Sequence, residues 1–439
     1  LSLSAFVILI VGMNLTILNL LPALIGALSG LMLYWIVRKN SGYVMALITL
    51  FLFLFSYANI LSSLYYTGQN LAVLLMLVGI YLFFERKKFS SGILMGIAAC
   101  ASVNIVVSFA ALVLLQFQWG KKSLMKLIGG FAASFGLIHV IFTLIAGKSF
   151  WLQMYGYHFN KPEQALQLSS KLKVLSFMSN AHAVLIVLAI IGVTLYLMRR
   201  WQPAQNENPK PLRVLHLAGT LLGANLLFLL LIDPIFPHYF LPLAPFAAIL
   251  GAEALVFSIL YLRKDSKKPR SQEAKDSSWD LGVLESWPLS PRNIAVTTVP
   301  IIIILLSLAH TLSFYKTELM IMNFTHAEEV AARIQDAVKE DETIYGDFGI
   351  VPLISFLSER RIAANELDSS VMRFESGLYE LDDVIQKLEE DNLGAVVSRV
   401  KRGIASYPPF RSYLEKNFFP LESVRPEKTG AVIEIWRRK

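Results

Sequence analysis

Two groups of polar side chains in this sequence are of types that bind anions. The first is His238 and Tyr239, which open an apolar run. The second lies within one short loop and comprises Tyr157, His158, Asn160 and Lys161, and Glu163 follows it. A protonated imidazole binds phosphate, and a lysine adds a positive point charge. Aromatic and basic residues also collect where membrane segments meet water, so an interfacial belt is the alternative interpretation of both groups.

Carboxylates are scarce around these groups. Asp233 is the only acidic residue between Glu207 and Glu253. An ionisable group at membrane depth is usually functional, whereas an aspartate before proline at a helix end simply lies in water. Glu253 falls near the middle of its apolar run, where burying a carboxylate is costly, so we expect it to be ion-paired. Asp233 and Glu163 are weak candidates for a reacting carboxylate.

The charge distribution divides the chain into two parts that suit different solvents. Residues 1–315 hold ten acidic residues and residues 316–439 hold twenty-two, and the first acid of all is Glu85. The chain is 55% hydrophobic, above the roughly 45–50% of soluble domains. The net charge of +8 arises from basic residues that flank the apolar runs, while the tail is mildly acidic. The positive charge therefore orients membrane segments and does not indicate nucleic-acid binding.

Apolar runs of membrane length make up the first part. A bilayer core needs about 20 apolar residues in a helix, and helices satisfy their own backbone groups in lipid. The clear runs lie near residues 15–37, 43–64, 67–84, 124–146, 178–198, 212–232, 238–262 and 294–315. Residues 91–118 are also apolar but are interrupted by Ala101-Ser102-Val103-Asn104. We expect about nine or ten membrane segments in all.

Basic loops predict how these segments are oriented. Lys and Arg concentrate in cytoplasmic loops, and the basic clusters here are Arg38-Lys39, Arg86-Lys87-Lys88, Lys121-Lys122, Arg199-Arg200 and a linker over residues 262–293. If all of these basic clusters lie on the cytoplasmic side, residues 91–118 must enter the membrane and return to the same side. A helical hairpin broken at Ser102–Asn104 would do this. We expect Ser102 and Asn104 to hydrogen-bond across the hairpin. Everything after Tyr315 then faces the outside.

Residues 316–439 predict a compact α/β domain. Thr325 through Glu328 form a capping box, and a helix follows. Short strands are expected at 343–345, 394–397 and 431–436, and helices at 349–358, 379–391 and 408–416. Strands that alternate with helices favour a mainly parallel sheet. Asp347, after the first strand, is expected to cap the helix that follows.

Other sharp chemical motifs are missing from the sequence. Cys100 is the single cysteine, no His, Cys, Asp or Glu spacing is typical of a structural zinc site, and no glycine-rich phosphate loop precedes a helix. The basic linker reads as a solvated segment.

Four stretches resemble a known family when taken in order. Residues 71–107 look like a span, a basic loop and a small-residue hairpin with Gly92 and Gly96. Residues 150–162 read FWLQMYGYHFNKP, like an aromatic external loop, and residues 233–251 resemble a late span that opens with a basic residue and tyrosine. Residues 344–363 resemble the start of a soluble tail domain. The chain thus resembles the polytopic GT-C glycosyltransferases of the dolichyl-phosphate-mannose–protein mannosyltransferase type, glycosyltransferase family 39.

This resemblance implies a fold and an activity. The fold is an α-helical polytopic membrane domain over residues 1–315 with a soluble extracytoplasmic α/β domain over residues 316–439. The activity is transfer of a sugar from a polyprenyl-phosphate donor to a hydroxyl of a lipid, protein or glycan at the outer face of the cytoplasmic membrane. Membrane lipids are the other expected partners, and a divalent metal ion is the one cofactor left open. The donor phosphate would be held by His238, Tyr239, Lys161, His158, Tyr157 and Asn160.

The chain departs from the family at the catalytic positions. The family's catalytic aspartate lies in the first external loop, which corresponds to residues before or within 1–14, where no acid occurs. Gln69 and Asn70 stand where the family often has an acid, and Asn104 stands where it often has lysine. Because residue 1 is Leu and not Met, we expect the native N-terminus, with this loop, to be missing.

Two other functions are alternatives to a glycosyltransferase. The second candidate is a non-catalytic scaffold of the same fold, and the third is a transporter, although the sequence shows no duplicated halves.

Overall fold

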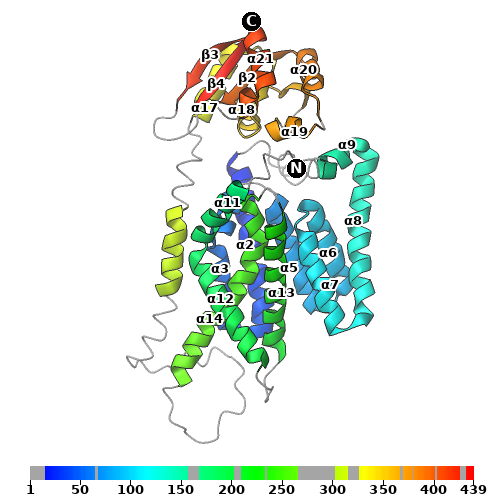
Figure 1. Ribbon diagram of the computed structural model, residues 1–439, viewed down its shortest axis with the longest axis vertical. Coiled ribbons are helices and arrows are strands. Elements are labelled where there is room, and N and C mark those ends of the chain that lie inside the picture. The colour runs from blue at the N-terminus through cyan, green and yellow to red at the C-terminus, as the bar shows by residue number, and fades with distance from the viewer. Residues whose placement is uncertain are drawn as a thin grey trace, which may run out of the picture. The chain divides into compact units, whose positions relative to one another are not determined.

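The computed structural model describes residues 15–64, 68–156, 168–201, 209–232, 235–264, 302–314, 326–365, 369–377, 379–400, 403–425 and 432–439. Its contacts divide the chain into two compact units. The first unit contains Leu1–Ile141 and Leu168–Tyr315, and the second contains Phe142–Gln167 and Lys316–Lys439. The first unit is a bundle of helices, and the second contains a four-stranded sheet (Figure 1).

The helical bundle follows the apolar runs of the sequence. Four described helices are long and apolar enough to cross a membrane, or up to six if each of two bent pairs counts as one span. The bundle helices are α2 (Leu15–Ser41), α3 (Tyr43–Leu54), α4 (Tyr57–Leu64), α5 (Gly68–Phe84), α6 (Lys88–Ala101), α7 (Ile105–Trp119), η1 (Lys121–Ser123), α8 (Leu124–Ala146), α11 (Leu168–Ala181), α12 (Ala183–Trp201), α13 (Pro209–Leu231), η4 (Pro237–Leu243), α14 (Ala244–Lys264) and the helix Ile302–Phe314. The shorter elements α9 (Lys148–Trp151) and η2 (Leu152–Gly156) follow α8.

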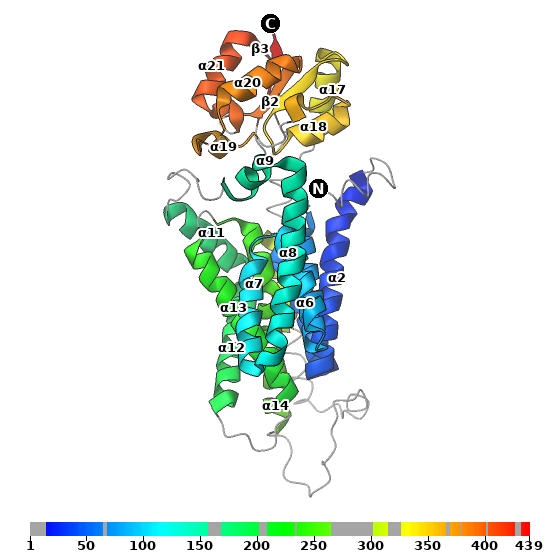
Figure 2. The same cartoon turned by 90° about the vertical axis from the view of Figure 1, so that its right-hand side faces the viewer.

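The hairpin expected around Ser102–Asn104 is present as α6 and α7. Phe131 of α8 lies beside Gly96 of α6, and its ring stacks on that of Phe109 of α7 with the centroids 3.9 Å apart. Both short helices therefore pack against α8 at the same residue. Figure 2 shows these three helices side by side. Since α6 and α7 have only 14 and 15 residues, each is too short to cross a bilayer core alone.

Two of the expected straight spans are bent instead. The run near 43–64 is two helices, α3 and α4, that meet at 52°, and α11 and α12 meet at 82° beside His182. The run near 238–262 begins as the 3-10 helix η4, with Pro237 at its start and Pro242 inside it.

The two ends of the bundle differ in charge. We call the end that holds Arg38, Lys39, Lys88 and Lys121 the basic end, and the end where α4 ends, α5 begins and α6 meets α7 the η4 end. Glu85 pairs with Lys39 at the basic end, and the expected ion pair of Glu253 is present, with Arg199. These are the only acidic residues in the part of the bundle that the structure describes.

The tail domain packs helices on both faces of a four-stranded sheet. The strands are β1 (Thr343–Gly346), β2 (Leu393–Arg399), β3 (Phe418–Val424) and β4 (Ile433–Arg438), in the order β1-β2-β4-β3. One core faces α17 (Ala327–Ala337) and α18 (Val351–Ser358), and the other faces α20 (Leu381–Glu390) and α21 (Pro408–Asn417). The remaining elements are η5 (Ala363–Asn365), α19 (Val371–Glu375) and η6 (Ile404–Ser406).

The expectation of a mainly parallel sheet is wrong. Only β1 and β2 pair in parallel, whereas β4 runs antiparallel to both β2 and β3. Strand β3, which the sequence did not predict, is followed by β4 after a connection too short for a crossover, so the two pair antiparallel. Thr325 of the expected capping box lies outside the described residues, and His326 at the start of α17 makes no side-chain cap.

Asp347 does more than cap a helix. Its oxygen Oδ1 accepts a hydrogen bond from the backbone of Gly349 at 3.1 Å, as expected for a turn. The carboxylate is fully buried and also pairs with two nitrogens of Arg399 at 2.5 and 2.9 Å. This ion pair joins the ends of the parallel strands β1 and β2, which makes Asp347 a structural residue.

Glycine allows α12 and α14 to approach closely. A Cβ atom added at Gly192 would overlap the carbonyl oxygen of Leu250, a backbone atom that cannot rotate away. Gly219 of α13 has nothing within 4 Å of the same position. The two glycines are therefore a matched pair for testing this contact.

We expect Gly192→Ala to lower the stability of the protein and Gly219→Ala to leave it unchanged or raise it. Forced overpacking costs about 1–3 kcal/mol, whereas alanine in an open helix position gains up to about 1 kcal/mol over glycine. Thermal unfolding of the purified protein in detergent measures both. Equal melting temperatures for the two variants would contradict the close packing of α12 on α14.

Candidate functional site

The η4 helix positions His238 and Tyr239. Pro237 fixes the start of the turn, and η4 packs against α4, α5 and α13. The His238 ring stacks on Phe236, with centroids 5.6 Å apart and planes 5° apart, and meets the Tyr239 ring edge-on at 4.7 Å. Both side chains are half-buried. The imidazole is thus held in place by rings at the η4 end.

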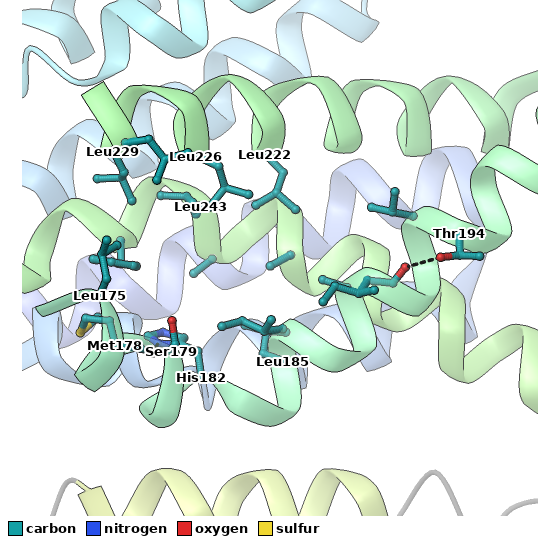
Figure 3. Close-up of a pocket in the computed structure, with 18 residues that line it drawn as sticks. Leu175, Met178, Ser179, His182, Leu185, Thr194, Leu222, Leu226, Leu229 and Leu243 are labelled. Atoms are coloured by element: carbon teal, nitrogen blue, oxygen red, sulfur yellow. Dashed lines mark hydrogen bonds between the residues drawn. The ribbon is translucent and has the colours of Figure 1, made fainter. Parts of the chain in front are cut away.

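An apolar cavity of about 520 Å³ adjoins η4 (Figure 3). Its walls come from α11, α12, α13, η4 and α14, and Phe240 and Leu243 of η4 are among the lining residues. Leu175, Leu185, Leu222, Leu226 and Leu229 supply much of the rest. The few polar side chains there include Ser179, His182 and Thr194. Such a lining suits a hydrocarbon chain rather than a polar molecule.

His182 supports the bend that shapes this cavity. Its Nδ1–H donates to the carbonyl oxygen of Met178 at 2.9 Å, and its Nε2 accepts from the backbone N–H of Ala58 at 3.0 Å. Both ring nitrogens therefore bind backbone groups, and His182 joins the α11–α12 bend to α4. Sequence reasoning missed it, although the polar run Ser179-Asn180 just before it marks the break.

Most of the expected phosphate-binding residues lie outside the described residues. These are Tyr157, His158, Asn160 and Lys161. The two weak candidates for a reacting carboxylate, Glu163 and Asp233, also lie outside the described residues. Of the expected set, the structure brings together His238 and Tyr239 alone. In the part of the chain that the structure describes, no group of three or more His, Cys, Asp or Glu side chains is arranged to hold a metal ion.

A group of buried amides and hydroxyls gathers at the η4 end. The members are Ser62, Gln69, Asn70 and Asn104, which we call the polar cluster. Asn70 donates from Nδ2 to the carbonyl oxygen of Ser62. The expected hydrogen bond of Asn104 across the hairpin is not formed from its Nδ2, which has no partner among the described residues. The backbone turns at Ser102–Asn104 close on themselves, so the side chain is not needed to hold the hairpin.

The chain is similar to a solved membrane protein, ArnT from Cupriavidus metallidurans. The crystal structure of ArnT bound to undecaprenyl phosphate matches with a TM-score of 0.58 and 12% identity, over 98% of this chain and 85% of that one. The apo state of ArnT matches with a TM-score of 0.53 and 13% identity over the same shares. Because the sequence identity is this low, the structural similarity shows the fold alone. This fold is the GT-C fold of polytopic membrane glycosyltransferases.

The family is shown by sequence. The model of glycosyltransferase family 87 matches residues 3–234, which are 232 of the 439 residues. The chain therefore belongs to glycosyltransferase family 87. A comparison with curated protein sequences gives no match. The predicted GT-C superfamily and the polytopic α-helical fold are confirmed, and the finer resemblance to glycosyltransferase family 39 stays a prediction.

We expect His182→Leu to destabilise the protein and His182→Gln to retain part of the lost stability. Leucine leaves the Ala58 N–H unpaired in an apolar setting, at about 1–3 kcal/mol, and removes the second of the two hydrogen bonds to the Met178 carbonyl, which keeps the bond from the His182 backbone. A glutamine amide can still donate and accept. Melting temperatures in detergent rank the three proteins. A His182→Leu protein as stable as the wild type would contradict the role of His182 in the bend.

Proposed function

We propose that the protein transfers a sugar from a polyprenyl-phosphate donor to an acceptor hydroxyl at the outer face of the cytoplasmic membrane. The observation that carries this proposal is the apolar cavity beside η4, whose lining includes Phe240, the residue that follows the half-buried His238 and Tyr239 in the chain. An amphiphile with a long hydrocarbon chain and a phosphate needs such a combination. Membership of glycosyltransferase family 87 supports the sugar, and the undecaprenyl phosphate bound to the similar ArnT structure supports the lipid.

The isoprenoid chain of the donor occupies the cavity lined by α11, α12, α13 and α14. Its leucine-rich wall offers hydrocarbon contacts to this chain, and Ser179, His182 and Thr194 are the few polar residues in the lining. Thr194, one of the polar residues in the lining, donates its hydroxyl to the Ile190 carbonyl oxygen of its own helix at 3.0 Å. The wall therefore presents hydrocarbon over most of its length.

The donor phosphate binds at His238 and Tyr239. An imidazole N–H and a phenol hydroxyl donate hydrogen bonds to the phosphate oxygens, and this stabilisation grows as the sugar leaves and negative charge develops. Lys161 adds a full positive charge, with His158, Tyr157 and Asn160 from the same loop. A divalent metal ion remains a further candidate for this task.

The reaction is a direct displacement that inverts the anomeric carbon. The acceptor oxygen attacks that carbon, a carboxylate takes the proton of the acceptor hydroxyl, and the polyprenyl phosphate leaves with the bonding electrons. Asp233 and Glu163 stay weak candidates for the base. Glu85 and Glu253 do not qualify, because Glu85 is ion-paired with Lys39 at the basic end and Glu253 is ion-paired with Arg199.

The orientation follows from the basic end. Arg38, Lys39, Lys88 and Lys121 face the cytoplasm by the positive-inside rule, so the η4 end faces outward. The domain over residues 316–439 is then extracytoplasmic, after a membrane domain over residues 1–315.

A non-catalytic scaffold of the same fold is the second candidate, favoured by the lack of a carboxylate at the η4 end among the described residues.

We expect His238→Ala and Lys161→Ala each to lower transfer from a polyprenyl-phosphate sugar by at least about tenfold. One charge-assisted hydrogen bond to phosphate contributes about 1.5–3 kcal/mol. Lys126→Ala is the matched control, since Lys126 is exposed on α8 and is expected to leave transfer unchanged. Radiolabelled sugar transfer in proteoliposomes measures all three. Full activity in both variants would remove these residues from the phosphate site.

A second variant tests the cavity directly. Ala247→Phe fills the space between the walls, so we expect the affinity for polyprenyl phosphate to fall while the fold is kept. Ile191→Phe adds the same ring on the exposed face of α12 and serves as its control. Lipid binding by native mass spectrometry compares them. Unchanged binding in Ala247→Phe would place the isoprenoid chain elsewhere.

A further inference from the structure

Three buried polar atoms at the η4 end lack a hydrogen-bond partner among the described residues. They are Ser62 Oγ, Gln69 Oε1 and Asn104 Nδ2. The side chains that carry them are 2%, 6% and 4% exposed as residues. Burying a polar group without a partner is unfavourable, so each such group in a native protein calls for an explanation.

These three atoms come from segments that meet. The Asn70 amide donates to the Ser62 carbonyl oxygen, which joins the end of α4 to the start of α5. Gly68 lies against the Ala101 carbonyl oxygen so closely that no Cβ fits between them, which joins the start of α5 to the end of α6. Asn104 follows three residues after Ala101. η4 packs against both α4 and α5, so the cluster adjoins the segment that carries His238.

Ser41 Oγ, at the last residue of α2, is a further buried atom without a partner among the described residues, but it is a single hydroxyl, whereas three such atoms occur at the polar cluster. Asn225 is a buried amide of the same kind on α13, and its Nδ2 donates to Ser108 Oγ at 3.0 Å and to the Leu221 carbonyl oxygen at 2.8 Å. The bundle thus satisfies a buried amide where the amide is structural. At the polar cluster it leaves one amide donor, one carbonyl acceptor and one hydroxyl unused.

We propose that Ser62, Gln69 and Asn104 bind the hydroxyls of the sugar that the donor carries, and that this sugar is uncharged. An amide donor, a carbonyl acceptor and a hydroxyl that does both match a row of sugar hydroxyls, each of which donates and accepts. No Asp, Glu, Lys or Arg occurs in α4, α5 or α7, and the one in α6, Lys88, lies at the basic end. A carboxylate or ammonium on the sugar would therefore find no counter-charge on the helices that carry the polar cluster. This inference rests on the proposed function and adds its sugar subsite.

Gln69→Met and Asn104→Leu test the proposal, because each keeps the volume and removes the polar atoms. Two lipids serve as probes, bare polyprenyl phosphate and polyprenyl phosphate carrying an uncharged hexose, with dissociation constants measured on the full chain in detergent. We expect the wild type to prefer the hexose-bearing lipid and each variant to lose about tenfold of that preference, as for one hydrogen bond. Affinity for the bare lipid stays the same. The melting temperature stays equal or rises, because an unsatisfied buried group has been removed.

Asn225→Leu is the matched control. It removes a buried amide that has partners, so its melting temperature falls while the preference for the hexose-bearing lipid stays intact. In the wild type, a lipid carrying a uronic acid is expected to bind no better than the bare lipid.

The outcomes separate the two proposals. If the wild type binds neither lipid, the proposed function fails. If the wild type prefers the hexose-bearing lipid and Gln69→Met and Asn104→Leu keep that preference, the sugar subsite is overturned while the function stands. A fall in melting temperature together with an unchanged preference would assign the cluster to folding, and equal wild-type affinity for both lipids would also overturn the subsite.

Discussion

The need to satisfy backbone groups inside hydrocarbon governs the architecture of this bundle. Lipid offers no hydrogen bonds, so every place where a helix breaks must supply its own partners. At the α3–α4 break, Ser56 Oγ donates to the Phe53 carbonyl oxygen at 2.7 Å, and Asn59 donates to that of Leu54 at 3.2 Å. At the α11–α12 bend, His182 serves one carbonyl and one N–H.

The end of α13 shows the same constraint. Its last carbonyl groups have no partner within the helix. Lys171 of α11 donates to the carbonyl oxygens of Leu230 and Ile232 at 2.8 and 2.9 Å. A basic residue at the η4 end is therefore used to close a helix. Against this background, the three unsatisfied atoms of the polar cluster are a departure, and the proposed sugar subsite would account for them.

Parts of this arrangement follow from individual residues in the sequence. The scarcity of acids before residue 316 identified the membrane part, and the polar interruption at Ser102–Asn104 between two basic loops required a hairpin, which α6 and α7 form. The mid-span position of Glu253 predicted an ion pair, found with Arg199. The bend at His182 and the strand β3 were not predicted, because one depends on Ala58, which is 124 residues away in the chain, and the other on pairing with β4.

The sequence by itself determined which segments lie in lipid, which end of each carries positive charge, and that the last part of the chain folds as a separate α/β domain. These properties depend on the free energy of transferring each segment from water to hydrocarbon, which is a sum over the residue types of a local stretch of sequence. Only the tertiary structure decided where helices bend, that the sheet is mixed, and that Ser62, Gln69 and Asn104 gather without partners beside η4. Those properties depend on which distant groups meet, because a hydrogen bond is satisfied or left open by its neighbours in space and not by its neighbours in the chain.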